Sequence, residues 1–151
     1  MAGRIVRRFL GSREIVAAGS APAGEPPPLP ADLERLPDYL REAVPGFAES
    51  PELQAVAARR DRPKAAAGAL GRYLLRLQRA VILREADVAE VAALERAYPV
   101  LEALASSEDP AVRELLDADV FGPFHSDDVV VAAAETLLGP RSRALYRRWA
   151  V

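Results

Sequence analysis

The sequence of 151 residues contains no cysteine, one lysine and one histidine. Without cysteine the chain has no disulfide framework, no thiolate zinc ligands and no thiol nucleophile, and it fits a reducing, cytoplasmic location. Aromatic residues make up only 6% of the chain, and runs of β-branched residues are short. The chain also lacks the run of roughly 20 apolar residues that a membrane-spanning helix needs. We therefore expect a cytoplasmic protein with no transmembrane segment and little β-structure.

The residues that are abundant are typical of helices. Hydrophobic residues make up 50% of the chain and are mostly alanine, leucine and valine. A chain of this length can bury a sizeable core as one domain. Arginine supplies all but one of the 20 basic residues, which is typical of a GC-rich genome and is weak support for nucleic-acid binding. This composition predicts an all-α, single-domain bundle of six or seven helices.

Three segments differ in composition. Residues 1–20 form a basic amphipathic segment, which could dock on the domain, form a tail or touch anionic lipid. Residues 21–31 are rich in proline, which favours an extended conformation and predicts a semi-rigid linker. Residues 32–151 hold the helical periodicity and form the predicted bundle domain.

The longest run of strong helix formers extends from Pro63 to Arg84. Apolar residues lie on two sides of this predicted helix, so we expect neighbours to pack on both sides of a central helix. Asp61 is the candidate N-cap. Gly68 and Gly71 either permit close approach of another backbone or weaken the start of the helix.

Other helix starts are marked by capping residues, often followed by proline. The predicted starts are Asp32, Ser50 with Pro51, Asp87 with Glu90 as a capping box, Asp109 with Pro110, Ser126 or Asp127, and Gly139 with Pro140. The helix from Asp87 to about Ala105 contains Pro99, which should bend it, and it should form an antiparallel hairpin with the central helix. Residues 120–124 are predicted to form an apolar turn that places both phenylalanines in the core. Trp149 is expected to be a core anchor.

Charge changes sign in blocks along the chain. Residues 59–84 are strongly basic, residues 85–135 are strongly acidic, and the last residues are basic again. Such blocks indicate either neighbouring helices of opposite charge or a polar surface for a partner.

No catalytic or metal-binding constellation is apparent. His125 has aspartates near it in sequence, but their spacing matches no known metal site and several stand at cap positions. No pair of carboxylates suggests acid–base catalysis, and no glycine-rich phosphate loop follows a strand. We predict no catalytic residues, no metal and no cofactor.

The C-terminal half has an order of motifs that resembles a family of small all-helical bacterial domains of unknown function, of the immunity-protein type encoded near toxins. The matching positions are Glu95, Leu101, Asp109, Val112, Leu115, Phe121, Leu138, Gly139, Pro140, Ser142 and Trp149. The resemblance implies a binding function and no catalytic residues.

Three functions are open at this point. The first is a non-enzymatic protein-binding domain, an immunity-type inhibitor of a neighbouring toxin, whose candidate contact residues are Asp38, Glu42, Asp117, Asp119, Asp127 and Asp128. The second is a nucleic-acid-associated regulator that contacts phosphate through an arginine-rich helix face. That face comprises Arg72, Arg76 and Arg79, with Arg59, Arg60, Arg62 and Lys64 beside it. The third is a small-ligand-binding bundle.

Overall fold

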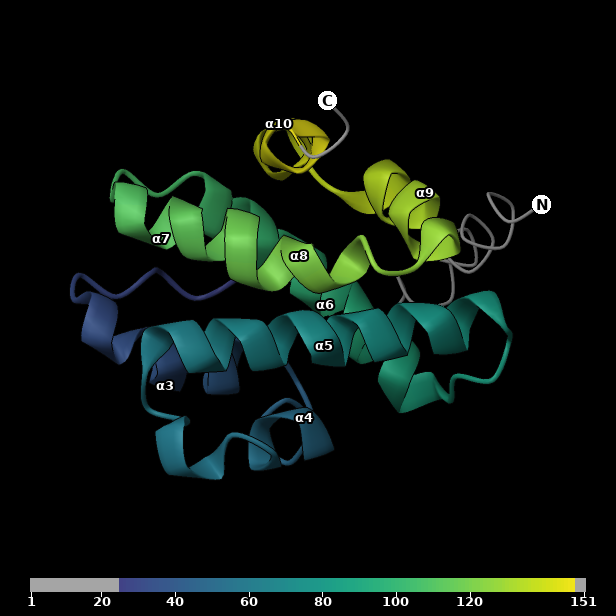
Figure 1. The fold of residues 1–151 in the computed structure, drawn as a ribbon, viewed down its shortest axis with the longest axis horizontal. Helices are drawn as coiled ribbons and strands as arrows, with labels where there is room; N and C mark the ends of the chain where they lie inside the picture. Colours follow the sequence, from purple (N-terminus) through teal and green to yellow (C-terminus); the bar gives the residue numbers. More distant parts are fainter. Residues whose placement is uncertain (1–24, 149–151) are drawn as a thin grey trace.

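The computed structural model describes residues 25–148, and all regular structure in this range is helical (Figure 1). The predicted N-terminal basic segment and Trp149 lie outside the described residues. The elements are η1 (Leu33–Arg35), α3 (Leu36–Ala43), α4 (Pro51–Gln54), η2 (Ala57–Arg59), α5 (Pro63–Ile82), α6 (Val88–Ala105), α7 (Pro110–Glu114), η3 (Leu115–Val120), α8 (Phe121–Phe124), α9 (Asp128–Leu137) and α10 (Pro140–Arg147). With α7, η3 and α8 taken as one continuous segment, the described chain holds seven helices, which confirms the predicted all-α fold.

Helix α5 is the centre of the fold. It runs the length of the molecule between the α7–α8 segment on one side and α3 and α4 on the other, and α6 turns back behind it (Figure 1). Its first residue is Pro63, but the predicted cap is wrong. Arg62 occupies the N-cap position without a side-chain bond, and Asp61 instead lies 3.4 Å from the Arg41 guanidinium. The helix ends at Ile82, two residues earlier than expected, and Arg84 then takes a left-handed conformation with φ of 61°.

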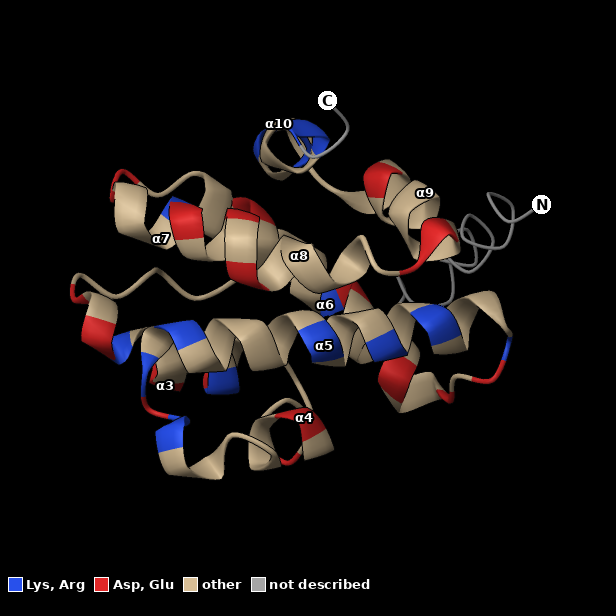
Figure 2. Cartoon of the chain, in the orientation of Figure 1, with Lys and Arg blue, Asp and Glu red and all other residues tan. Residues whose placement is uncertain are grey.

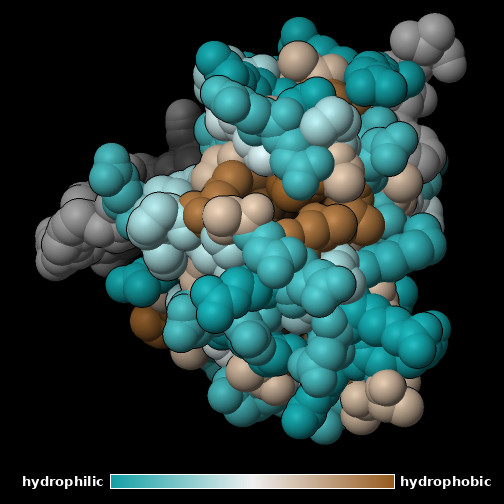
Figure 3. Space-filling view, turned by 90° about the vertical axis from the view of Figure 1, so that its left-hand side faces the viewer, coloured by the Kyte–Doolittle hydropathy of each residue, from teal (hydrophilic) through white to brown (hydrophobic). Residues whose placement is uncertain are grey.

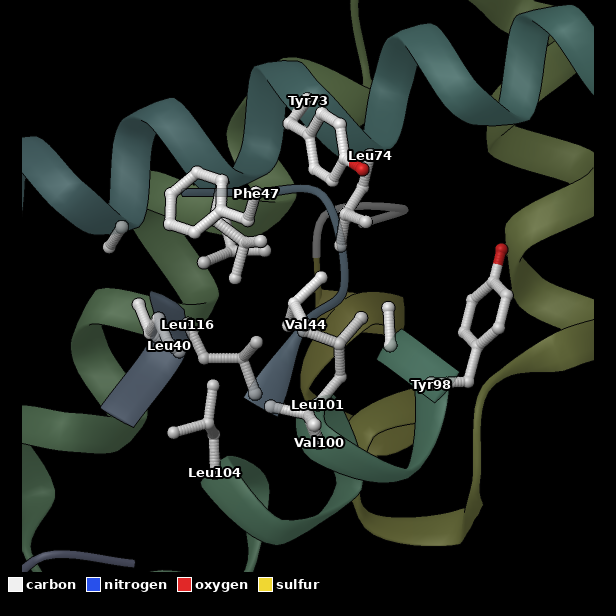
Figure 4. Packing of buried hydrophobic residues seen from close by; sticks show 14 of the residues in the cluster. Leu40, Val44, Phe47, Tyr73, Leu74, Tyr98, Val100, Leu101, Leu104 and Leu116 are labelled. Atoms are coloured by element: carbon white, nitrogen blue, oxygen red, sulfur yellow. The ribbon is translucent and has the colours of Figure 1, made fainter. Parts of the chain in front are cut away.

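Side chains from α3, α5, α6 and η3 meet in one core (Figure 4). Phe47 and Leu116 are both fully buried in it. The core also contains one polar pair between α5 and α6, in which the Tyr98 hydroxyl donates to Gln78 Oε1 at 2.7 Å. Gln78 in turn donates to the Leu74 carbonyl at 3.1 Å, so both buried polar side chains are bonded.

Most predicted helix starts are confirmed. Ser50 caps α4, Asp109 caps α7, and Asp127 rather than Ser126 caps α9. Asp87 and Glu90 form the expected capping box at the start of α6. Asp32 caps only η1, because Pro37 restarts the chain as the separate helix α3.

The predicted turn at residues 120–124 is wrong, because the chain stays helical from Pro110 to Phe124. The middle of this segment, η3, is a π-helix. Both phenylalanines are fully buried, as expected, and the Phe121 ring packs edge-on against Tyr146 at 5.1 Å. Pro123 lies within this helical segment, three residues after the π-helix ends.

The backbone of the α7–α8 segment approaches α5 closely at Gly71. A Cβ at Gly71 would lie 2.5 Å from the Val120 carbonyl oxygen and 2.8 Å from that of Asp119. At Gly68 a Cβ would meet only the Arg72 guanidinium, at 3.4 Å. Close backbone approach is therefore confirmed for Gly71 and is absent at Gly68.

The proline-rich segment contacts the bundle. Tyr39 of α3 donates its hydroxyl to the Pro27 carbonyl at 2.8 Å, and Leu29 is partly buried against the core. Residues 25–30 are therefore held against α3 before the first helix begins.

Candidate functional site

Three of the nominated aspartates are engaged within the molecule. Asp119 accepts from Lys64 Nζ at 2.9 Å, and Asp127 accepts from Arg79 Nε at 2.6 Å. Asp117 lies 3.6 Å from the Arg148 guanidinium. The side chains of all three are only about one-fifth exposed (18% to 21%). Their carboxylates therefore connect neighbouring elements of opposite charge, as Figure 2 shows for α5 and the α7–α8 segment.

Asp127 stabilises the fold in two ways, so alanine substitution of Asp127 and of the adjacent Asp128 should have different effects. Its side chain caps α9 through the amides of Val129 and Val130, and it also binds Arg79. We expect Asp127→Ala to lower the free energy of unfolding by about 1–2 kcal/mol. Asp128→Ala should change it by less than about 0.5 kcal/mol, because Asp128 is exposed. Urea unfolding of both variants checks this, and equal losses would contradict it.

The arginine face of α5 is not a continuous basic stripe. Arg76 makes two hydrogen bonds to the Glu52 carboxylate, at 2.7 and 3.0 Å. Arg79 is bound to Asp127. Of the three arginines of the nominated face, only Arg72 is exposed without an ion pair in the described part of the chain. A row of phosphate contacts along this face would have to break these pairs.

The other nominated carboxylates, Asp38 and Glu42, lie one turn apart on α3 and line a hollow beside the proline-rich segment. This cleft of about 330 Å³ is lined by Pro28, Pro30, Arg35, Asp38, Tyr39 and Glu42. A second cleft of about 160 Å³ adjoins it and is lined by Glu25, Pro26, Pro27, Glu42, Ala43, Arg96 and Val100. Glu42 belongs to both clefts. We call these two clefts and their lining residues the α3 surface.

An apolar strip crosses the end of the molecule at which α5 and α7 begin, between two hydrophilic regions (Figure 3). The proline-rich segment and η1 lie at the same end (Figure 1). Partly buried apolar residues of the proline-rich segment, η1, the start of α5 and the start of η3 are Leu29, Leu33, Ala65 and Leu115. Leu29 stands between the two prolines, Pro28 and Pro30, that line the larger cleft.

A third hollow lies at the start of α5 and is basic. It measures about 330 Å³ and is lined by Val56, Arg59, Arg62, Lys64, Ala65, Gly68, Arg72 and Asp119. We call it the basic cleft. The cations of this cleft stand close together in the sequence and were predicted as a group. The sequence does not show that Gly68 leaves room between them, because that room depends on how η2 and η3 pack against α5.

Other candidate sites receive little support from the structure. Among residues 25–148, no three histidine, aspartate or glutamate side chains come together as metal ligands do. His125 packs against the Tyr146 ring with 4.7 Å between ring centroids, and burial lowers the pKa of His125 while the nearby Asp117 opposes the shift. No helix in the described range is long and apolar enough to cross a membrane.

Comparison with known proteins gives no relative. No family model, no curated protein and no solved structure matches this chain.

Proposed function

We propose that the protein is a non-enzymatic helical domain that binds another protein and acts as an immunity-type inhibitor of a toxin encoded beside it. The α3 surface is the observation that carries this proposal. Glu42 is exposed at the junction of two clefts whose walls include prolines and Tyr39. Apolar walls beneath a charged rim are typical of protein interfaces. An inhibitor of this type would act in the bacterial cytoplasm.

Charge favours a basic partner at this surface. Three carboxylates, those of Glu25, Asp38 and Glu42, line the two clefts together with two cations, Arg35 and Arg96, so the lining has a net charge of −1. Asp38 is bonded to Arg41, whereas Glu42 forms no ion pair within the described residues. An arginine or lysine of the partner could therefore insert beside Glu42 without first breaking an internal bond, and complementary charge would also speed association.

The neighbouring toxin provides a direct test. The open reading frame beside this gene is expressed in a test host alone, with this protein, and with its Glu42→Lys variant. We expect growth to stop with the neighbour alone and to recover with the wild-type protein. The Glu42→Lys variant should restore growth poorly, because its lysine would face the basic groups of the toxin.

Asp128→Lys serves as the matched control. Asp128 is also exposed and was nominated with Glu42, but it lies on α9, at the opposite end of the molecule from α3 (Figure 1). It should restore growth like the wild type. A harmless neighbour would contradict the immunity proposal, and equal rescue by both variants would contradict the assignment to the α3 surface.

A further inference from the structure

The basic cleft has an excess of positive charge that the protein does not neutralise. Four cations and one carboxylate line it, which gives a net charge of +3. The carboxylate, Asp119, is held by Lys64. Arg59, Arg62 and Arg72 are exposed, and none of them forms an ion pair within the described residues. The whole chain has a formal charge of −2, so this concentration of positive charge is local.

Separate elements bring these cations together. Arg59 belongs to η2, Arg62 is the N-cap of α5, and Lys64 and Arg72 lie on the first three turns of α5. Gly68 lies between them and keeps the floor open, because the Arg72 guanidinium is the nearest group to the position of a Cβ there. The positive end of a 20-residue helix opens into the same space, and the Arg62 side chain does not cap it.

We infer that the basic cleft binds a phosphoryl group, either as free phosphate or on a small phosphorylated molecule. A dianion with several acceptor oxygens balances a net charge of +3 better than a single carboxylate does. The planar donor fork of arginine also matches phosphate oxygens. The volume of about 330 Å³ lies at the lower end of the range for small-molecule pockets, and Val56 and Ala65 provide an apolar wall for the rest of such a molecule.

The distribution of charge favours a compact ligand over a nucleic acid. Double-stranded DNA presents a phosphate about every 1.7 Å along its axis and is bound through rows of cations. Here the next basic positions along α5, Arg76 and Arg79, are already bonded to Glu52 and Asp127. Among the cations of α5, Arg72 alone has no ion pair within the described residues, and it lines the cleft. The cations there can surround one group, but they do not continue along the helix as contacts to a nucleic-acid strand would require.

The full-length protein is titrated with inorganic phosphate and, separately, with glycerol phosphate, against sodium chloride at matched ionic strength. Amide chemical shifts of Lys64 and Ala65, at the start of α5, report on binding. We expect saturable shifts with phosphate and none with chloride. Tighter binding of glycerol phosphate would identify a small phosphorylated molecule as the ligand, and equal binding would identify free phosphate.

Variants locate the site. Arg59→Gln and Arg72→Gln should each raise the Kd for phosphate about tenfold, because each removes a charge-assisted hydrogen bond. Arg60→Gln is the matched control, since Arg60 is exposed in the same stretch but does not line the cleft. It should change the Kd less than twofold. Gly68→Ala keeps every charge but narrows the basic cleft, so it should weaken phosphate binding while the fold is retained.

Several results would overturn the inference. One is the absence of saturable shifts with either phosphate compound. Another is an equal rise of the phosphate Kd in Arg60→Gln and Arg72→Gln, which would indicate general electrostatic attraction and no defined site. Tight binding of duplex DNA or of a polyglutamate peptide with no binding of phosphate would assign the cleft to a macromolecule.

The phosphate site and the proposed protein-binding surface can fail separately. Glu42→Lys should leave the phosphate Kd unchanged, and Arg72→Gln should leave growth rescue unchanged. The two experiments therefore test different residues through different measurements.

Discussion

Gly71→Ala should lower the free energy of unfolding by about 2 kcal/mol, even though alanine is the better helix former. The new methyl group would lie 2.5 Å from the Val120 carbonyl oxygen, so α5 and the α7–α8 segment would have to separate. Backbone atoms cannot move aside as a side chain can. For a chain of this length the loss corresponds to a fall in Tm of roughly 4–8 °C, measurable by thermal unfolding followed by circular dichroism.

Gly68→Ala is the matched control for this prediction. It makes the same chemical change in the same helix, but the nearest group is the movable end of Arg72, at 3.4 Å. We expect this variant to gain up to about 1 kcal/mol from helix propensity alone. If both alanine variants changed the free energy of unfolding in the same direction, the short distance between Gly71 and the Val120 carbonyl would not explain the effect of Gly71→Ala.

Glu102→Ala should be the second large loss, about 2 kcal/mol. The Glu102 carboxylate, on α6, accepts from the backbone amides of Arg141 and Ser142 at 3.0 and 2.9 Å, and from the Ser142 hydroxyl at 2.9 Å. It thereby caps α10 from another helix. Ser142 is fully buried, so removal of the carboxylate leaves donors that water reaches poorly. Hydrogen exchange should show the loss first at the start of α10.

The same carboxylate should make stability depend on pH. Burial raises the pKa of Glu102, but the hydrogen bonds from Ser142 and Arg141 outweigh burial and hold the pKa below its usual value. Its contribution is therefore complete above the unfolded-state pKa, near pH 4, and is lost as the pH falls further. Glu102→Gln should flatten this part of the profile. An unchanged profile in the variant would show that Glu102 is not the group responsible.

Local signals in the sequence predicted the helix starts well. A cap such as Asp87 or Asp109 bonds to amides within three residues of itself, so its role depends on nearby residues alone. The same holds for Pro51, Pro110 and Pro140, each of which is the first residue of its helix. The all-α fold followed from composition and helical periodicity in the same way.

Features that depend on distant residues were missed. Nothing near Glu102 indicates that it caps a helix that begins nearly 40 residues later. Gly122 and Pro123 resemble a turn, yet packing of the flanking phenylalanines keeps the segment helical. Gly68 and Gly71 look alike in the sequence, and only the position of Val120 distinguishes them.

The candidate sites also divide into features that nearby residues predict and features that depend on distant residues. The charge blocks correctly suggested neighbouring helices of opposite charge, but they could not show which carboxylates would be engaged. The structure pairs Asp117, Asp119 and Asp127 internally and leaves Glu42 and Asp128 exposed without an ion pair among the described residues. The basic cleft likewise requires η2 and η3 to lie against the start of α5, which no local pattern specifies.

The central claim, that this domain binds a toxin through the α3 surface, is tested most directly by the affinity of the purified protein for the product of the neighbouring reading frame. Isothermal titration at physiological salt should give a Kd of about 1 µM or tighter, as a stable interface of standard size allows. The Kd should rise at least about tenfold for Glu42→Lys and stay the same for Asp128→Lys. No detectable binding of the wild-type protein, or equal affinity of both variants, would contradict the account.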